Sequence, residues 1–307
     1  MSQYFAIIFG KNMEQTLRQT IDSLRTQSCV PTDIIVVDDG STDRTGELLT
    51  IFKRSLDHAS PPTFHSIRLP ESSYDLRRIP LLWNVALEYA ERREMAGKFF
   101  LVGADDDELS PKYAETLLRE MEDDFALVIS SGEVSGRAFK SAIGISAPEG
   151  GGRIYAYPFF KAHVGRFPTS YGYESWVLYK AHQLGFKAKK IFSEDATINH
   201  LRPLGSIHGF REWGLSMACA EYLPLYVLLR AGQNLLLNHK IISWRGTLKM
   251  TWDYFKARLH PPRDDWAYKK WRTTDPELVK WIRRNQAKQI IRTLTYPVRF
   301  AVKKLLA

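Results

Sequence analysis

Short apolar runs recur through the first part of the chain and alternate with segments of helical periodicity. Two of these runs, Ile34 to Val37 and Phe99 to Val102, stop abruptly at carboxylates. A signal for the start of a helix follows each run, which is typical of buried parallel strands whose polar ends reach one rim of a sheet. In an open α/β sheet, ligands bind at the rim that the carboxyl ends of the strands form.

Other strands and helices fit the same alternation. The pattern predicts a strand from Tyr4 to Phe9 and a helix from Asn12 to Gln27, with Asn12 as the expected cap. Another strand is predicted from Phe64 to Leu69, before a helix that runs from about Pro80 to Glu94. The expected fold class is therefore α/β, Rossmann-like, with a mostly parallel sheet flanked by helices.

The pattern changes at about Ser206 to helices separated by Pro and Gly, with aromatic and basic residues interleaved. We therefore predict an α/β domain over residues 1–205 and a helical, basic extension over residues 206–307. A Gly-rich turn at residues 149–152 fits either a mobile active-site loop or a surface excursion, and the excursion is slightly favoured.

Charge is spread unevenly over the chain. Residues 230–307 hold 18 Lys and Arg against 5 Asp and Glu, a net of +13, whereas the total is only +9 and the rest of the chain is therefore at −4. The basic character thus belongs to the extension. Such a surface attracts an anionic membrane or nucleic acid.

A helix predicted from Asp275 onward has apolar residues that broadly share one face. Basic residues flank that face, which fits docking on an anionic membrane surface. It fits almost as well a helix that packs on the catalytic part with a solvated basic side, and nucleic acid is an unlikely partner. The apolar positions are Leu278, Trp281, Ile282, Ile290, Ile291 and Leu294.

The two cysteines, Cys29 and Cys219, lie far apart and match no metal-binding spacing, which favours a reducing compartment. We expect neither a signal peptide nor a transmembrane helix, because no segment has the required apolar length. The expected location is the cytoplasm, with attachment to the cytoplasmic face of the membrane left open.

Two acidic groups stand where the strands end, Asp38-Asp39 and Asp105 to Asp107. Carboxylates accept hydrogen bonds from the donors of a base or ribose, and they also bind hard cations. The pair therefore indicates a nucleotide reader beside a divalent metal site. The alternative for each group is a simple strand end followed by a helix cap.

The run Asp38 to Asp43, Asp-Asp-Gly-Ser-Thr-Asp, followed by a strand that ends in an Asp-rich motif, resembles the family 2, GT-A type glycosyltransferases. The resemblance covers roughly residues 4–205. It implies a GT-A fold and an inverting transfer of a sugar from a nucleoside-diphosphate sugar. The expected acceptor is a hydroxyl of a glycan or a lipid-linked glycan, as in polysaccharide biosynthesis.

The resemblance also implies which residues contact the donor. Asp38 and Asp39 are expected to hold the nucleoside, and Asp105 to contact the ribose or the metal. Asn84 is the position that survives from the family's Arg-Asn-x-Gly segment. Arg78 is expected to reach the diphosphate through charge-assisted hydrogen bonds, with a solvated loop as the equal alternative.

For the metal, the resemblance implies Mg²⁺ or Mn²⁺ held by Asp105, Asp107 and His200, with the part of Asp106 left open. The imidazole of His200 stands about where family members carry a histidine that completes the coordination. A structural histidine is the alternative.

Glu174 is the expected general base, which takes the proton of the acceptor hydroxyl. The family has Glu-Asp here, and Ser175 replaces that Asp in this chain.

Two other functions stay open on the sequence. A nucleotidyltransferase also needs a nucleotide pocket and metal carboxylates, although the segment after the first strand, Phe9 to Asn12, is poor in Gly for that class. A non-catalytic protein that binds nucleotide sugar, membrane or nucleic acid is the third class.

Overall fold

The computed structural model describes residues 3–56, 61–71, 73, 75–95, 97–135, 148–202, 207–237 and 242–305. Two compact units make up the described chain. The first unit lies within residues 3–135, 148–169 and 180–202, and the second within 170–179 and the residues from 207 onward. The second unit therefore takes a short segment from the middle of the chain.

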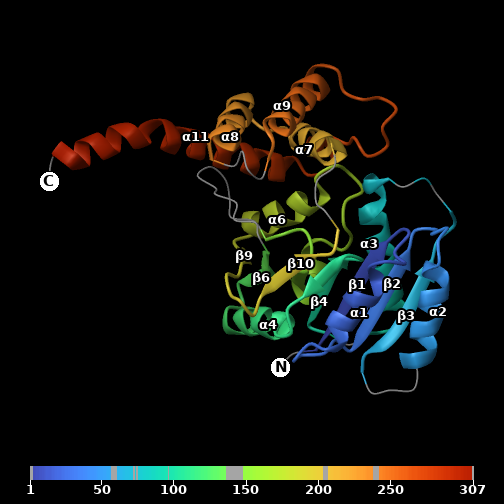
Figure 1. Ribbon diagram of the computed structural model, residues 1–307. Coiled ribbons are helices and arrows are strands. Elements are labelled where there is room, and N and C mark those ends of the chain that lie inside the picture. Colours follow the sequence, from blue (N-terminus) through green and yellow to red (C-terminus); the bar gives the residue numbers. More distant parts are fainter. Residues whose placement is uncertain are drawn as a thin grey trace. The chain divides into compact units, whose positions relative to one another are not determined.

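A mostly parallel sheet is the centre of the first unit (Figure 1). In the described part of the chain it has seven strands in the order β3-β2-β1-β4-β8-β6-β9, and only β8 runs antiparallel to its neighbours. Their bounds are β1 Tyr4–Gly10, β2 Asp33–Asp38, β3 Thr63–Arg68, β4 Phe99–Ala104, β6 Leu127–Ser131, β8 Arg153–Ala156 and β9 Lys187–Lys190.

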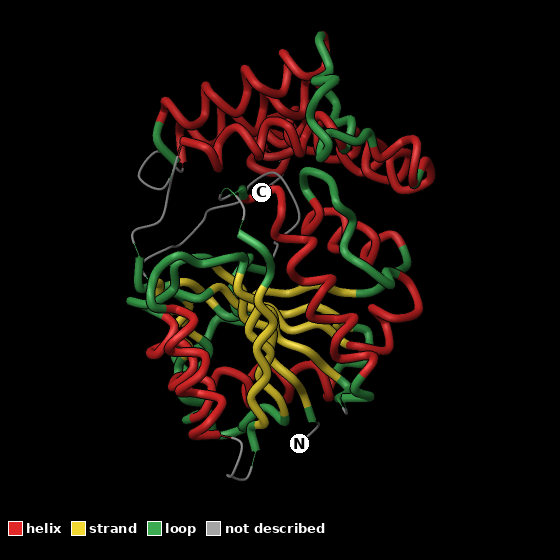
Figure 2. Tube along the Cα trace, turned by 90° about the vertical axis from the view of Figure 1, so that its right-hand side faces the viewer, coloured by secondary structure: helices red, strands yellow, loops and turns green. Residues whose placement is uncertain are grey.

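Helices cover both faces of this sheet (Figure 2). Side chains alternate between the faces of a strand, so Tyr4, Ala6 and Ile8 share one face with α1, α2 and α4. On the opposite face, Phe5 stacks on Phe100 beside α3 and α5. The helices are α1 Leu17–Arg25, α2 Thr45–Leu56, α3 Ile79–Arg92, α4 Tyr113–Asp123 and α5 Tyr157–His163.

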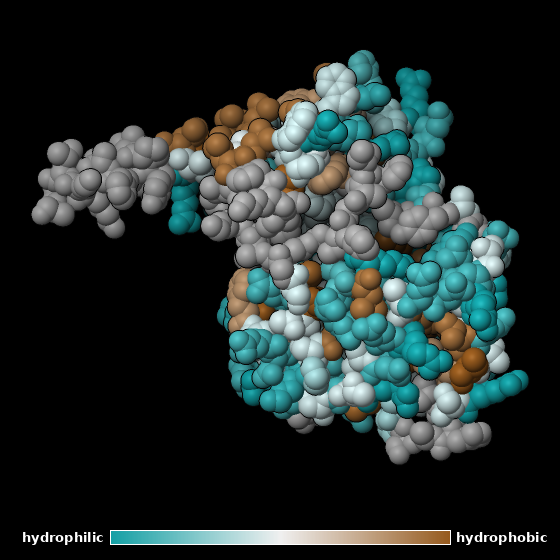
Figure 3. Space-filling model, in the orientation of Figure 1, coloured by the Kyte–Doolittle hydropathy of each residue, from teal (hydrophilic) through white to brown (hydrophobic). Residues whose placement is uncertain are grey.

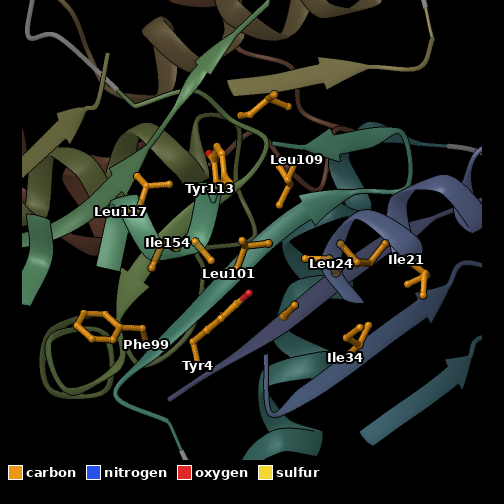
Figure 4. Close-up of a cluster of buried hydrophobic side chains, with 14 of the residues drawn as sticks. Tyr4, Ile21, Leu24, Ile34, Phe99, Leu101, Leu109, Tyr113, Leu117 and Ile154 are labelled. Atoms are coloured by element: carbon orange, nitrogen blue, oxygen red, sulfur yellow. The ribbon is translucent and has the colours of Figure 1, made fainter. Parts of the chain in front are cut away.

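The core on the first face is continuous across the central strands (Figure 4). Leu24 of α1, Ile34 of β2 and Leu101 of β4 all lie within it and are fully buried. Strands covered on both faces need apolar residues at successive positions, which is why the sequence reads as unbroken apolar runs. The predicted parallel α/β fold is confirmed.

A small second sheet has its strands in the order β5-β10-β7. Its strands are β5 Asp107–Leu109, β7 Glu133–Val134 and β10 Thr197–His200. The antiparallel pairing of β5 with β10 places His200 directly opposite Asp107.

The second unit is helical and has its own core, in which Tyr254 and Leu278 are completely buried. Helix α6, Tyr173–Gln183, begins in this unit and ends in residues of the first. The remaining helices are α7 Ile207–Cys219, α8 Pro224–Leu237, α9 Trp244–Leu259, α10 Trp271–Thr274 and α11 Pro276–Leu305. Among the described residues, no helix has both the length and the apolar character to cross a membrane.

One local prediction is wrong. Helix α1 begins at Leu17, and Asn12 does not cap it. Asn12 instead adopts a left-handed backbone conformation, with φ at 56°. Its side-chain oxygen accepts a hydrogen bond from the backbone N–H of Thr42, at 2.9 Å, and so ties the end of β1 to the loop after β2.

Candidate active site

The first acidic pair lies where β2 ends, beside the end of β1. Asp38 is fully buried, and its Oδ1 accepts hydrogen bonds from both the backbone N–H and the hydroxyl of Ser41. Its other oxygen lies 3.4 Å from the guanidinium of Arg68. Asp38 therefore holds the turn that presents Asp39.

Asp39 is also buried, and Arg78 binds it with two parallel contacts of 2.7 and 3.1 Å. Such a bidentate pair fixes both side chains more strongly than a single contact does. Gly40 follows with φ at 69°, and a Cβ there would collide with the backbone of Glu71. The loop thus needs glycine at this position to keep Asp39 in place.

Asp105 begins the second acidic group, directly after β4. Its carboxylate accepts a hydrogen bond from the Thr16 hydroxyl at 2.8 Å and lies 2.7 Å from the guanidinium of Arg202. Burial raises the pKa of Asp105 to about 6, although Arg202 pulls that pKa down. The side of Asp105 that faces β1 is tightly packed, because a Cβ on Gly10 would lie 2.6 Å from its Oδ1.

The structure brings Asp106, Asp107 and His200 together, with one potential ligand atom from each inside a span of 4.8 Å. Asp107 Oδ1 lies 2.9 Å from Nδ1 of His200, which the pairing of β5 with β10 places opposite it. Burial and the neighbouring Asp107 both raise the pKa of Asp106. The two carboxylates therefore favour a cation between them.

The donor set suits a divalent metal, since two carboxylates and an imidazole are ligands that Mn²⁺ accepts and the carboxylates suit Mg²⁺. Asp107 is held for such a role from two sides. Its Oδ2 accepts a hydrogen bond from the backbone N–H of Ala104 at 2.8 Å, and Gly151 packs so closely that a Cβ would lie 2.9 Å from its carboxyl carbon.

Asp105, which we expected among the metal ligands, is outside this group. Its carboxylate contacts Arg202 and Thr16, whereas Asp106 lies in the group with Asp107 and His200, so the metal role of Asp105 stays a prediction. The sequence prediction of Asp107 and His200 as neighbours agrees with the structure.

Two other predicted site residues, Asn84 for donor binding and Glu174 for catalysis, lie outside the acidic groups in sequence. Both ends of the Asn84 amide bind the backbone of Phe167, at 2.9 and 2.8 Å, which fastens α3 to the segment after α5. Glu174 lies in the first turn of α6 and belongs to the second unit. Their roles in donor binding and catalysis stay predictions.

Sequence reasoning missed Thr16 and Gly151, which both touch the acidic group. Thr16 directly precedes α1, at the helix's N-cap position, and gives no motif. Gly151 belongs to the Gly-rich turn that we had favoured as a surface excursion, whereas it packs against Asp107. Only the run of glycines itself pointed to a close approach of the backbone.

The model of the family described as Glycosyl transferase family 2 matches residues 6–167, more than half of the chain. The chain belongs to glycosyltransferase family 2. The matched residues contain both acidic groups and the strands that carry them. This family 2 member is therefore a nucleotide-sugar glycosyltransferase of the GT-A type, and the match decides against a nucleotidyltransferase.

Solved structures of glycosyltransferases share its fold at low identity. The S. aureus TarS 1-349 structure in complex with UDP is 16% identical, with a TM-score of 0.50 over 97% of this chain and 92% of that one. The Pyrobaculum calidifontis mannosyltransferase PcManGT, in complex with GDP-Man and Mn²⁺, is 14% identical, with a TM-score of 0.54 over 96% and 86%. At such identity, the likeness shows the fold alone.

The longer S. aureus TarS structure is matched over 92% of this chain but only 50% of its own, with 16% identity and a TM-score of 0.49. The family 2 chain thus spans about half the length of that protein. No curated protein matches its sequence.

Proposed function

We propose that this glycosyltransferase transfers a hexosyl group from a nucleoside-diphosphate sugar to a hydroxyl of a glycan or lipid-linked glycan, with inversion. One observation supports this most: Asp39 follows the parallel strand β2, and Asp106 and Asp107, which meet His200 of β10, follow the parallel strand β4. Both strands pair with β1, so their carboxyl ends meet at one rim, where α/β folds bind nucleotides.

The loop after β2 is the proposed nucleoside site. Asp39 offers two acceptor oxygens, and in the structure Arg78 occupies both of them. We propose that nucleoside donors take the place of Arg78 on Asp39, which frees the guanidinium for the diphosphate. Binding of the donor thus replaces the Asp39–Arg78 pair by two interactions, one between Asp39 and the nucleoside and one between Arg78 and the diphosphate. Asp38 supports this loop through Ser41 and Arg68.

The proposed metal is Mg²⁺ or Mn²⁺ at Asp106, Asp107 and His200. When bound, such an ion offsets the charge that develops on the diphosphate leaving group. The chain's own part is to orient Asp107 and His200, through the Ala104 N–H and the pairing of β10 with β5. Arg202 and Thr16 contact the carboxylate of Asp105, which the proposal leaves outside the metal group.

Glu174 is the proposed general base for the acceptor hydroxyl. The assignment rests on the family's motif, and Glu174 itself lies in the first turn of α6. With Ser175 in place of the usual Asp, Glu174 is the carboxylate left at the motif. A single displacement from the opposite side of the sugar would follow.

Thermal stabilisation by nucleotides tests this proposal. UDP, GDP, dTDP and CDP, with and without Mn²⁺, are added to the wild type and to Asp39→Ala, because the fold is shared with one structure that holds UDP and another that holds GDP-Man. A ligand that binds only the native state must raise its apparent stability. We expect metal-dependent stabilisation by one nucleotide, and loss of that effect in the variant. A folded wild type that responds to none of them would refute the donor site.

Attachment to an anionic membrane is a further part of the proposal, and exposed apolar residues of the second unit support it. Leu278, Ile282 and Ile290 of the predicted amphipathic face are buried in the second unit's core, whereas Ile291 and Leu294 of the same face are exposed. Exposed apolar residues also form stripes on α8 and α9, some of which appear brown over α8 in Figure 3. The stripes are Leu225, Leu228, Leu235 and Leu236 on α8 and Trp244, Leu248, Trp252 and Leu259 on α9.

The α9 stripe has the composition of a helix that lies in a membrane interface. Trp252 is 68% exposed, and the basic residues Arg245 and Lys256 flank the stripe. Trp at the interface and basic flanks toward anionic headgroups are what such helices use. Sedimentation with phosphatidylglycerol vesicles tests it: Trp252→Gln should weaken binding, and Phe125→Gln, at an 89% exposed site on the first unit, should not. Equal binding of both variants would contradict the surface.

A further inference from the structure

A cavity of about 320 Å³ in the second unit is lined mainly by basic side chains. The residues come from three helices and the segments between them: Arg258 of α9, Arg272 of α10, Arg283 of α11 and Lys270 just before α10. Glu221 is the carboxylate in the lining. All of these residues belong to the second unit, so the cavity does not depend on how the donor site works.

Two of the cationic groups, those of Arg258 and Arg272, have partners that hold them in place. Arg258 donates to the carbonyl of Tyr222 and to the hydroxyl of Tyr254, both at 3.1 Å. Arg272 is 2.5 Å from the carboxylate of Glu221, which neutralises one charge. Among the described residues, no carboxylate forms an ion pair with Arg258, Lys270 or Arg283. Three positive charges around one cavity are thus left uncompensated.

A second cavity, of about 450 Å³, adjoins the first because Arg272 and Arg283 line both. Lys280 and Arg284 of α11 add two further cations to it. Like charges held close together repel, and a concave site concentrates their field on an anion. Guanidinium groups in particular match the oxygens of phosphate with paired hydrogen bonds.

We propose that these two adjoining cavities, the basic cavity of the second unit, bind a phosphate-bearing ligand, with Arg258, Lys270 and Arg283 around the first phosphate. Arg272 and Arg284 extend the site for a second phosphate, so a pyrophosphate group fits better than a single phosphate. The same chemistry is offered by a soluble phosphate ester and by the headgroup of an anionic lipid.

Calorimetric titration of sodium pyrophosphate into the whole chain tests the proposal. EDTA is present, so that a divalent metal at Asp107 and His200 cannot contribute a diphosphate site. Arg283→Gln is compared with Arg292→Gln, a matched loss of one charge at an exposed position of the same helix outside both cavities. We expect wild type and Arg292→Gln to bind within a factor of two of each other, and Arg283→Gln to bind at least about tenfold more weakly.

Lys270→Gln is a second variant that keeps the test decisive if Arg283→Gln folds poorly, because Lys270 is exposed before α10. It should also weaken pyrophosphate binding. Absence of binding to the wild type, or equal effects of Arg283→Gln and Arg292→Gln, would overturn the proposal, since the second result would show only a general loss of charge.

Vesicles that contain phosphatidic acid separate the two sources of phosphate. If Arg283→Gln loses pyrophosphate binding and vesicle binding while Arg292→Gln keeps both, a lipid headgroup occupies the cavity. If only pyrophosphate binding is lost, the ligand is a soluble phosphate ester. Vesicle binding by a wild type that ignores pyrophosphate would contradict the site.

Discussion

Replacing Gly151 by alanine should displace Asp107 from the proposed metal site. A Cβ at position 151 would lie 2.8 Å from Oδ1 of Asp107 and 2.9 Å from its Cγ, well inside ordinary contact. The two groups must therefore separate by roughly 0.5–1 Å to reach normal carbon contact distances. The backbone of Gly151 itself has no left-handed strain, so the collision is the main effect.

The carboxylate of Asp107 has little room to move. It is 1% exposed, and its Oδ2 accepts the hydrogen bond of the Ala104 N–H. Breaking that bond leaves a buried donor unpaired, which costs about 1–3 kcal/mol. At about 2 kcal/mol, the melting temperature should fall by about 4–8 °C for a unit of this size. A reacting group misplaced by about 1 Å lowers turnover by about 100-fold.

Titration of Mn²⁺, followed by the electron paramagnetic resonance signal of the free ion, measures the effect on the metal. Gly151→Ala should bind Mn²⁺ more weakly than the wild type. Gly232→Ala on α8 is the matched control, since a Cβ there meets no atom within 4 Å, and it should keep full Mn²⁺ affinity. If Gly151→Ala bound Mn²⁺ as tightly as the wild type, the turn and not Asp107 would have moved, and the reasoning would be refuted.

Further outcomes follow from single contacts. Asn84→Ala removes both hydrogen bonds to Phe167, so the free energy of unfolding should fall by about 1–3 kcal/mol and the melting temperature with it. An unchanged melting temperature would contradict the structural role. Glu174→Gln should lower sugar transfer at least about 100-fold while nucleotide affinity stays the same, as measured by turnover and calorimetry; equal turnover would exclude it as the base. Burial lowers the pKa of His182. Below about pH 6.5 the unfolded chain therefore binds more protons than the native one, so the melting temperature should decrease as the pH is lowered. In His182→Gln the melting temperature should depend less on pH over the same range. The anomeric configuration of the product, read by proton NMR, should be opposite to that of the donor.

The central sheet could be predicted because its signal is local and strong. The strands β1, β2 and β4 are covered on both faces, so nearly every residue in them is apolar until the strand ends. The carboxylates come directly after these apolar residues, because a charged side chain can be solvated or can bind a ligand only once the strand has reached the rim of the sheet. Fold class and family were therefore both accessible from the sequence.

The roles inside the second acidic group could not be read locally. Three successive aspartates look alike in the sequence, and the pairing of β5 with β10 decides which of them meets His200. Asp105 pairs with Arg202, whose side chain comes from a distant part of the chain, and it lies outside the group that Asp106 and Asp107 form with His200. Asn12 could not be assigned locally either, because asparagine suits both a helix cap and the left-handed conformation. The hydrogen bond with Thr42, from a distant loop, accompanies the left-handed conformation in the structure.

The face of α11 illustrates the limit for helices. Periodicity identified its apolar residues correctly, but an apolar face looks the same whether it meets a membrane or another helix. Leu278 and Ile282 pack in the core of the second unit, while Leu225 and Leu228 of α8 stay exposed. Tertiary packing, which the pattern of one helix does not contain, decides which face remains free.

Release of nucleoside diphosphate from a panel of nucleotide sugars tests the central claim most directly, because water can replace an acceptor hydroxyl in slow turnover. The account predicts release from one nucleotide sugar that requires Mn²⁺ or Mg²⁺ and is lost in Asp107→Asn. Release that persists at the wild-type rate in Asp107→Asn, or that needs no divalent metal, would contradict the metal-assisted transfer proposed for this site.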